Sequence, residues 1–289
     1  MPSIAQEQRQ YLTYLLTDDN HQTRLEVVPE RGGIITRWQV KGQEILYLDE
    51  SRFADPGLTV RGGIPILFPI CGNLPENTYR YQGQNYHLKQ HGFARDLPWT
   101  VVAQRTQPDV ALQLRLTSNE QTRQNYPFEF ELLFTYRLEG QSLVIEQQCI
   151  NRSLEPMPCS IGFHPYFSVR DKSQLRFDIP ATRFQNQQNQ TIHPFSGQFD
   201  FTQDEIDVAF SEVSRSTASA TDLDRQIKLS LEYDSLYSTL VFWTIRGKDY
   251  YCLEPWSAPR NALNSGEHLT QIAPGDHFTA SIKLVVDFL

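Results

Sequence analysis

The feature of this sequence that most constrains its fold is an alternation of apolar and polar residues with a period of two. The clearest run places apolar side chains at every second position: Phe128, Phe130, Leu132, Phe134, Tyr136 and Leu138. The intervening positions are mostly polar and include Glu129, Glu131, Thr135 and Arg137. Successive side chains of a β-strand point to opposite faces, so this pattern is typical of an antiparallel strand with one face in water.

Three further segments alternate in the same way, over residues 110–116, 227–233 and 278–288. Turn-forming tripeptides separate the runs: Lys41-Gly42-Gln43, Gln82-Gly83-Gln84, Gln107-Pro108-Asp109 and Glu139-Gly140-Gln141. Helical periodicity is nearly absent, and the polar stretches 185–190 and 211–224 are typical of surface loops. We therefore predict an all-β fold, with one large antiparallel β-sandwich domain over residues 1–289.

Charge and apolar content argue against several classes of protein. The formal net charge is −8, whereas a nucleic-acid-binding face needs clustered basic residues. The most apolar stretch, Ile64 to Cys71, is too short to cross a membrane. The first ten residues do not read as a signal peptide, and the four cysteines form no C-x-x-C pair. We expect a cytoplasmic protein with reduced cysteines and neither nucleic-acid nor membrane partners.

Four segments break the alternation and combine Gly, Pro, His, Arg, Glu and aromatic residues. They cover residues 61–73, 90–99, 162–167 and 251–262. Places where the local pattern fails are candidates for function, because a site imposes residues that the fold alone does not require. A sandwich with a concave face would let these segments converge.

Two histidines and one carboxylate stand out in these segments: His91, His164 and Glu254. Histidine titrates near neutral pH, and partial desolvation beside Trp256 and Tyr251 would raise the pKa of Glu254. Such a set suits general acid–base chemistry. Each residue is also compatible with a structural role, as a hydrogen-bonded histidine or a salt-bridged strand glutamate.

Two other chemistries use similar residues. Two histidines and a glutamate can bind zinc, but the H-x-H and H-E-x-x-H spacings are absent. A serine hydrolase of the G-x-S-x-G type lacks its motif here. Arg61-Gly62-Gly63 belongs to neither G-x-G-x-x-G nor the P-loop pattern. We therefore expect neither a metal nor a nucleotide cofactor.

Five motifs follow one another in order along most of the chain: Arg61-Gly-Gly-Ile-Pro-Ile-Leu-Phe-Pro69, His91-Gly-Phe-Ala-Arg95, Gly162-Phe-His-Pro-Tyr-Phe167, Ile206-Asp207 and Leu253-Glu-Pro-Trp-Ser-Ala-Pro-Arg-Asn-Ala-Leu-Asn264. Together they resemble the aldose 1-epimerase (galactose mutarotase-like) superfamily, and most of all its branch with the glucose-6-phosphate 1-epimerases. The resemblance implies the galactose mutarotase-like supersandwich fold. It also implies interconversion of the α and β anomers of an aldose, which has no redox step and needs no cofactor.

The resemblance implies roles for the three acid–base residues. Glu254 is similar to the family's general base at the C1 hydroxyl. His164 is similar to the general acid at the ring oxygen. His91 matches the second histidine, which hydrogen-bonds the sugar and stabilises developing charge.

Three more residues match substrate-binding positions of the family. Asp207 looks like the carboxylate that accepts hydrogen bonds from sugar hydroxyls. Arg61 and Arg95 match positions that bind substrate oxygens, which in the sugar-phosphate branch belong to the phosphate. The expected partner is thus a small sugar or sugar phosphate, and the sequence leaves the choice between them open. A carbohydrate-binding protein without catalysis, on the same sandwich, is the alternative function.

Overall fold

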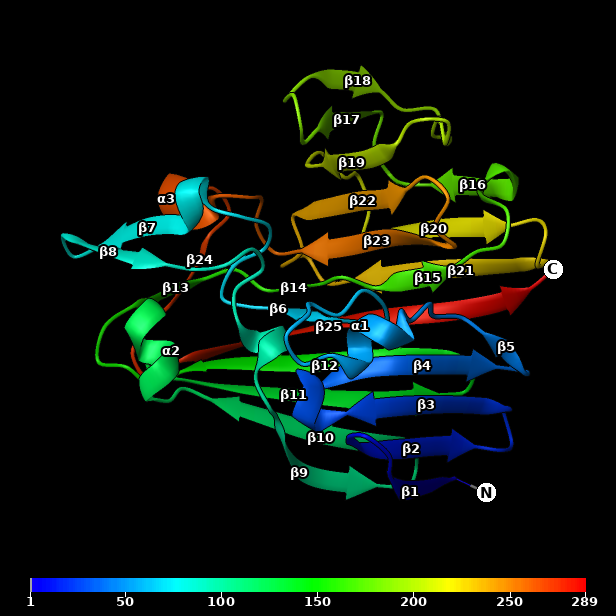
Figure 1. The fold of residues 1–289 in the computed structure, drawn as a ribbon, viewed down its shortest axis with the longest axis horizontal. Coiled ribbons are helices and arrows are strands. Elements are labelled where there is room, and N and C mark those ends of the chain that lie inside the picture. Colours follow the sequence, from blue (N-terminus) through cyan, green and yellow to red (C-terminus); the bar gives the residue numbers. More distant parts are fainter. Residues whose placement is uncertain (1) are drawn as a thin grey trace.

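The structure is a computed structural model that describes residues 2–289, and about half of these residues lie in antiparallel strands (Figure 1). All four alternating runs form strands: β10 (Val110–Thr117), β11 (Phe130–Glu139), β21 (Ile227–Tyr233) and β25 (His277–Phe288). In β11 the five side chains at alternate positions from Phe130 to Leu138 are apolar and buried, and the side chains between them are only partly buried. The predicted all-β antiparallel fold is confirmed.

Three larger sheets organise these strands. The N-terminal sheet has the order β1-β2-β3-β4-β5, with strands Ser3–Gln8, Leu12–Asp18, Thr23–Val28, Ile34–Val40 and Gln43–Glu44. The second sheet, which we call the β25 sheet, has the order β16-β20-β21-β25-β12-β11-β10-β9. Its strands not yet described are β16 (Leu175–Asp178), β20 (Thr217–Asp222), β12 (Ser142–Asn151) and β9 (Thr100–Arg105).

The third sheet, called the β23 sheet, has the order β18-β17-β19-β22-β23-β14-β6, and β15 also pairs with β23. Its strands are β18 (Ile192–Pro194), β17 (Arg183–Asn186), β19 (Glu205–Phe210), β22 (Thr239–Ile245), β23 (Tyr250–Trp256), β14 (Gly162–Phe163), β6 (Ile66–Leu67) and β15 (Tyr166–Ser168). Two short ribbons complete the strands, β7 (Thr78–Tyr81) with β8 (Gln84–His87) and β13 (Met157–Cys159) with β24 (Thr270–Ile272).

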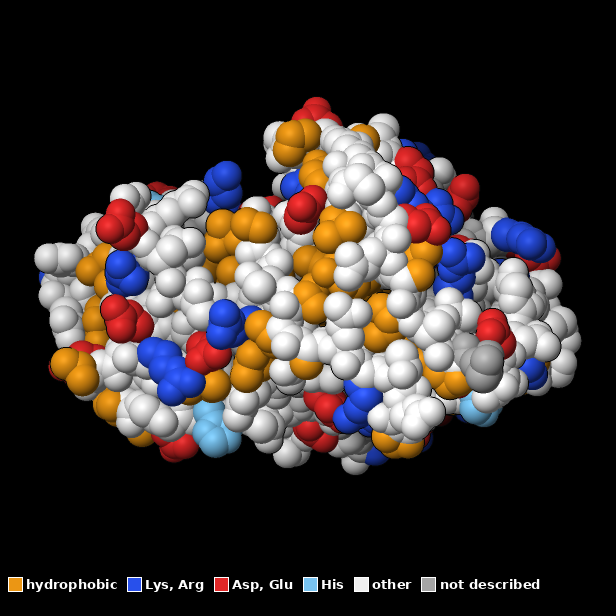
Figure 2. Space-filling model, turned by 90° about the horizontal axis from the view of Figure 1, so that it is seen from below, with side chains coloured by type: hydrophobic (Ala, Val, Ile, Leu, Met, Phe, Trp, Pro, Cys, Tyr) orange, Lys and Arg blue, Asp and Glu red, His pale blue; other side chains and the backbone are white. Residues whose placement is uncertain are grey.

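Helices are short and lie between the strands. They are α1 (Glu50–Ala54), α2 (Glu120–Asn125), α3 (Ala262–Ser265) and the 3-10 turns Pro29–Arg31, Pro75–Asn77, Ala94–Asp96 and Lys172–Gln174. Among residues 2–289, no helix has the length and apolar character needed to cross a membrane. On the face seen in Figure 2, acidic and basic side chains are interspersed rather than gathered by sign.

Aromatic side chains fill the space between the β25 and β23 sheets. Phe134 of β11 contacts Phe163 of β14 with ring centroids 5.8 Å apart. Phe177 of β16 packs against Phe242 of β22 at 5.0 Å and against Tyr251 of β23 at 5.6 Å. These contacts bury one face of each sheet in a shared core, as in a β-sandwich. The other face of the β23 sheet is therefore free to carry a site.

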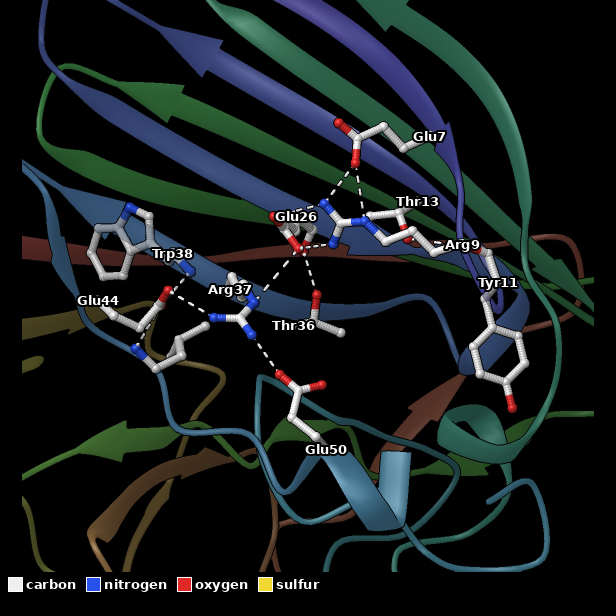
Figure 3. A network of polar contacts seen from close by, with 11 residues as sticks. Glu7, Arg9, Tyr11, Thr13, Glu26, Thr36, Arg37, Trp38, Glu44 and Glu50 are labelled. Atoms are coloured by element: carbon white, nitrogen blue, oxygen red, sulfur yellow. Dashed lines mark hydrogen bonds and ion pairs between the residues drawn. The ribbon is translucent and has the colours of Figure 1, made fainter. Parts of the chain in front are cut away.

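An ion-pair network crosses the N-terminal sheet (Figure 3). Arg9 bridges Glu7 and Glu26, with nitrogen–oxygen distances of 2.7 and 2.8 Å. Arg37 lies on the other side of Glu26 and also contacts Glu44 and Glu50. Glu26 is buried, so two guanidinium groups offset the desolvation of one carboxylate.

One predicted loop is wrong in part. Residues 217–222, within the stretch 211–224, form strand β20, which pairs with β16 and β21. Its buried face consists of small side chains, among them Ala218 and Ala220. Such residues bury too little apolar surface to produce a hydrophobic signal in the sequence. In the other predicted loop, Gln185 and Asn186 belong to β17, and the turn follows them.

Candidate active site

Strand register places His164 opposite Glu254. Gly162 of β14 pairs with Trp256 of β23, and Tyr166 of β15 pairs with Cys252. Both pairings continue one register, in which His164 falls opposite Glu254. Residues that face each other in antiparallel strands project their side chains to the same side of a sheet. The motif around residues 162–167 and the motif around residues 253–264 therefore meet with their acid–base groups side by side.

Two prolines open the backbone ladder at this point. Pro165 follows His164 and Pro255 follows Glu254, and proline has no N–H with which to continue a ladder. The backbone N–H of His164 instead donates to the carbonyl of Pro65, at 3.1 Å. The strand thus divides into β14 and β15, and the gap between them presents the imidazole.

His91 is held by a reciprocal pair of hydrogen bonds with Gly72. The backbone N–H of His91 donates to the Gly72 carbonyl at 2.7 Å, and the backbone N–H of Gly72 donates to His91 Nδ1 at 3.0 Å. His91 has a φ of 66°, a left-handed conformation that histidine adopts more readily than most residues. Because Nδ1 accepts a hydrogen bond, the neutral ring carries its proton on Nε2.

All six residues predicted for the site line one cavity of about 310 Å³: Glu254, His164, His91, Arg61, Arg95 and Asp207. The cavity lies on the outer face of the β23 sheet. Cross-strand pairing puts Asp207 of β19 beside Trp243 of β22, and Val241 beside Glu254. Alternation along each strand then directs all of these side chains to the same face.

Glu254 and His164 are in direct contact inside the cavity. Glu254 Oε1 lies 3.3 Å from His164 Nε2, and Glu254 Oε2 accepts a hydrogen bond of 3.1 Å from Trp256 Nε1. The Glu254 side chain is 1% exposed. Burial, followed by the charge of Asp207, raises its pKa well above the usual value. A carboxylate in this setting is a stronger base than one in water.

Burial favours the neutral form of both histidines. Burial, with the nearby guanidinium of Arg95, lowers the pKa of His164 to about 3. Burial also lowers the pKa of His91 well below 6.5, and Arg95 and His164 add to the effect. The two rings meet edge to face with centroids 5.4 Å apart. His164 is further fixed by stacking on Tyr166, at 4.7 Å between centroids.

Asp207 is joined to an arginine that the sequence did not single out. Arg260 Nη2 donates to both carboxylate oxygens of Asp207, at 2.9 and 2.8 Å. The Arg260 guanidinium lies 5.6 Å from the ring of Trp256 and donates from Nη1 to Asn73 Oδ1 at 3.0 Å. Burial raises the pKa of Asp207, and Arg260 opposes that rise.

Arg61 and Arg95 differ from Arg260 because neither forms an ion pair with a carboxylate within residues 2–289. Arg61 lies over the ring of Trp243, at 5.7 Å. Arg95 donates from Nη2 to the Gln90 carbonyl at 2.8 Å, and its buried Nε has no partner among the described residues. Burial lowers the pKa of Arg95. These two guanidinium groups give the cavity a positive side with no acidic residue bound to it.

Sequence reasoning missed several residues of the cavity wall. Arg260 stands inside the Leu253–Asn264 motif, so its place in that motif was an available signal. Glu205 and Trp243 gave no such signal. Trp243 Nε1 donates to Glu205 Oε1 at 2.7 Å, and both side chains line the cavity.

One set of side chains has the composition of a metal site. Ligand atoms of His164, Cys252 and Glu254 lie within 4.8 Å of one another. Metal ligands of this kind must lose their protons, but burial raises the pKa values of both Cys252 and Glu254. Arg61 and Arg95 also line the cavity and repel a cation. The set therefore fits a metal ion poorly and fits proton transfer well.

Known proteins resemble this chain in sequence and in fold. The sequence matches the family described as "Aldose 1-epimerase" over residues 14–284. A protein of Escherichia coli K12 named "Putative glucose-6-phosphate 1-epimerase" is 31% identical over 156 residues. That match covers 53% of this chain and 48% of the relative, so it spans about half the length of each.

Two solved structures are similar over almost the whole chain. The Slr1438 protein of Synechocystis sp. PCC 6803 is 49% identical and superposes with a TM-score of 0.95, with 99% of each chain covered. A galactose mutarotase-like protein of Clostridium acetobutylicum is 20% identical, with a TM-score of 0.84 over 100% of this chain and 99% of that one. The second likeness confirms the predicted mutarotase-like fold.

Proposed function

This chain belongs to the aldose 1-epimerase family, and on that premise we propose that it interconverts the α and β anomers of a hexose or hexose 6-phosphate. The observation that carries the proposal is the contact between Glu254 Oε1 and His164 Nε2, at 3.3 Å inside a cavity of about 310 Å³. Mutarotation needs one base and one acid that reach adjacent oxygens of the same ring. A carboxylate and an imidazole on one face of a sheet meet that need.

In the proposed reaction Glu254 removes the proton from the C1 hydroxyl. The bond between C1 and the ring oxygen breaks, and His164 gives a proton to that oxygen. Rotation about the C1–C2 bond turns the other face of the aldehyde toward the ring oxygen's hydroxyl group, and the reverse transfers close the ring. His91, neutral with its proton on Nε2, donates a hydrogen bond to the sugar and stabilises negative charge on its oxygens.

The acid–base pair must hold one proton for this cycle. Burial favours the neutral form of each group, with the proton on Glu254 and a neutral His164. Transfer of that proton across the 3.3 Å contact produces the carboxylate and the imidazolium that the reaction uses. The two titrations are coupled, so the pair is described by its total proton count.

Arg61 and Arg95 favour a phosphorylated sugar over a free one. Both line the cavity, and within residues 2–289 neither is neutralised by a carboxylate. Guanidinium groups bind phosphate oxygens through charge-assisted hydrogen bonds. We propose that these two arginines hold the phosphate of a hexose 6-phosphate, while Asp207 and Arg260 contact hydroxyl groups.

The test is the rate of anomer exchange, measured by polarimetry with fresh α-glucose and by exchange NMR with glucose 6-phosphate. We expect catalysis above the spontaneous rate, a higher kcat/KM for the phosphate, and loss of that preference in Arg61→Gln. The preference should also shrink as salt is added. A wild-type protein that binds these sugars without accelerating exchange would instead be a carbohydrate-binding protein.

A further inference from the structure

The rim of the catalytic cavity carries a third guanidinium group, that of Arg52. This residue belongs to α1, outside the five sequence motifs, and it lines the same cavity as Arg61 and Arg95. The acid–base residues His164 and Glu254 are buried, whereas Arg52 is only partly buried. The part of a substrate that Arg52 can contact is therefore a group that points from the sugar ring toward solvent, away from the reacting carbon.

The acidic residues beside Arg52 in the chain make other contacts. Asp49 caps α1, where its Oδ1 accepts a hydrogen bond of 3.1 Å from the backbone N–H of Arg52. Glu50 pairs with Arg37 of β4 (Figure 3). Asp55 accepts a backbone hydrogen bond of 2.8 Å through its own Oδ1. Within residues 2–289 the Arg52 guanidinium forms no ion pair, so its positive charge is available to a ligand.

Two hydrogen bonds close the loop of residues 49–61, which carries Arg52 and ends at Arg61. At the ends of the loop, the backbone N–H of Asp49 donates to the Arg61 carbonyl at 2.9 Å. Across its middle, Arg52 Nε donates to the carbonyl of Thr59 at 3.0 Å. Thr59 itself lines the cavity. The bond through Nε fixes the guanidinium group and leaves its two terminal nitrogens to bind a ligand.

A buried arginine holds the same loop in one shape. Arg31 Nη2 donates to the carbonyls of Asp55 and Leu58, at 2.8 and 2.6 Å, and Arg31 Nε donates to the carbonyl of Phe53 at 3.4 Å. Arg31 is buried and pairs with no carboxylate of residues 2–289. Burial of an unpaired charge costs free energy, and here the hydrogen bonds that offset this cost all go to the loop. A binding wall that is fixed before the ligand arrives loses less entropy on binding.

We infer that Arg52 sets the charge specificity of the site: together with Arg61 and Arg95 it binds a doubly charged phosphate at C6 of the hexose. The inference rests on the proposed function and narrows its substrate class to hexose 6-phosphates. Two guanidinium groups suffice for a planar, singly charged carboxylate, whereas a third matches the second charge and the third terminal oxygen of a phosphate. A hexuronate, which carries a carboxylate at the same carbon, is therefore a poorer substrate.

The experiment measures kcat/KM for anomer exchange of glucose 6-phosphate, glucuronate and glucose by exchange NMR on the full chain. We expect the wild type to prefer glucose 6-phosphate to both other sugars. Arg52→Gln should lower the ratio of glucose 6-phosphate to glucose by about ten- to hundredfold, as expected for one lost charge-assisted hydrogen bond. Arg52→Lys, which keeps the charge without the planar fork, should recover part of the ratio. The loss in Arg52→Gln should shrink below about pH 6, where the phosphate takes up a proton.

Arg24→Gln is the matched control, because Arg24 is an exposed arginine of β3 that does not line the cavity. It removes the same charge and should leave the ratio unchanged. An equal loss in Arg24→Gln would mean that only the net charge matters, and the inference would be wrong. It would also be wrong if Arg61→Gln lowered the ratio and Arg52→Gln did not, or if the wild type used glucuronate as well as glucose 6-phosphate. Absence of exchange with every sugar would overturn the proposed function, and this inference with it.

Discussion

Replacement of Glu254 by glutamine tests the acid–base proposal most directly. The substitution keeps the shape of the side chain and leaves an amide oxygen to accept the hydrogen bond from Trp256 Nε1. It removes a carboxyl group that contacts His164 and whose pKa is raised by burial. Loss of a positioned base typically costs about 10²- to 10⁴-fold in rate, which is roughly 3 to 5 kcal/mol of transition-state stabilisation.

The other carboxylates of the cavity are not free to replace Glu254. Both oxygens of Asp207 accept hydrogen bonds from Arg260. Both oxygens of Glu205 are also occupied, one by Trp243 Nε1 and the other by Gln188 Nε2. We therefore expect the loss to lie toward the upper end of that range. The assay is anomer exchange by NMR, with the spontaneous rate subtracted.

The same substitution should not destabilise the protein at neutral pH. A carboxyl group whose folded pKa lies above its unfolded value stabilises the fold fully below the unfolded pKa. That contribution is lost as pH rises through the folded pKa. Glutamine has no such loss, so the Glu254→Gln variant should match or exceed the wild-type melting temperature. A folded variant that keeps more than about a tenth of the catalysed rate would refute the assignment of Glu254 as base.

The pH profile of kcat/KM, measured at constant ionic strength, should show a broad plateau. Burial raises the pKa of Glu254 and lowers the pKa of His164 to about 3, so the pair holds one proton over the wide pH range between these two pKa values. Treatment with EDTA, checked by metal analysis, should leave activity unchanged, because cavity arginines disfavour a cation beside His164 and Glu254. Tyr136→Phe should lower the free energy of unfolding, measured by urea titration, by about 1–3 kcal/mol without loss of activity. The reason is that Tyr136 Oη donates a hydrogen bond of 2.6 Å to the buried carbonyl of Gly33.

The regular part of the fold could be predicted from the sequence because each strand there buries one face. Strands such as β11 and β25 bring apolar side chains to the core at every second position, and the side chains between them face the solvent. β23 does not follow this rule, since all seven of its residues are buried. The walls of the cavity cover the outer face of β23. The polar and aromatic side chains on that face are therefore buried as well, and the sequence of the strand does not alternate between apolar and polar residues. Its neighbours in the sheet could not be deduced from periodicity.

The prediction of the six cavity residues came from the motifs that contain them and not from the alternation of apolar and polar residues. The pairing of Arg260 with Asp207 shows the limit, because the two residues are 53 positions apart and meet only through the pairing of β19, β22 and β23. No spacing rule connects them. The one-domain organisation of residues 1–289 stays a prediction, as do the roles of the individual site residues.

The distribution of unsatisfied polar atoms gives an independent reason to place function in this cavity. Nine buried side-chain atoms of residues 2–289 have no hydrogen-bond partner, and three of them, Arg95 Nε, His164 Nδ1 and Arg260 Nε, belong to residues that line the cavity. Folded proteins satisfy nearly all buried polar groups, because each orphan costs about 1–3 kcal/mol. A fold that needed only to be stable would replace such groups with apolar side chains. Retaining them around Glu254 costs stability, and a polar ligand that supplies the missing partners accounts for that cost.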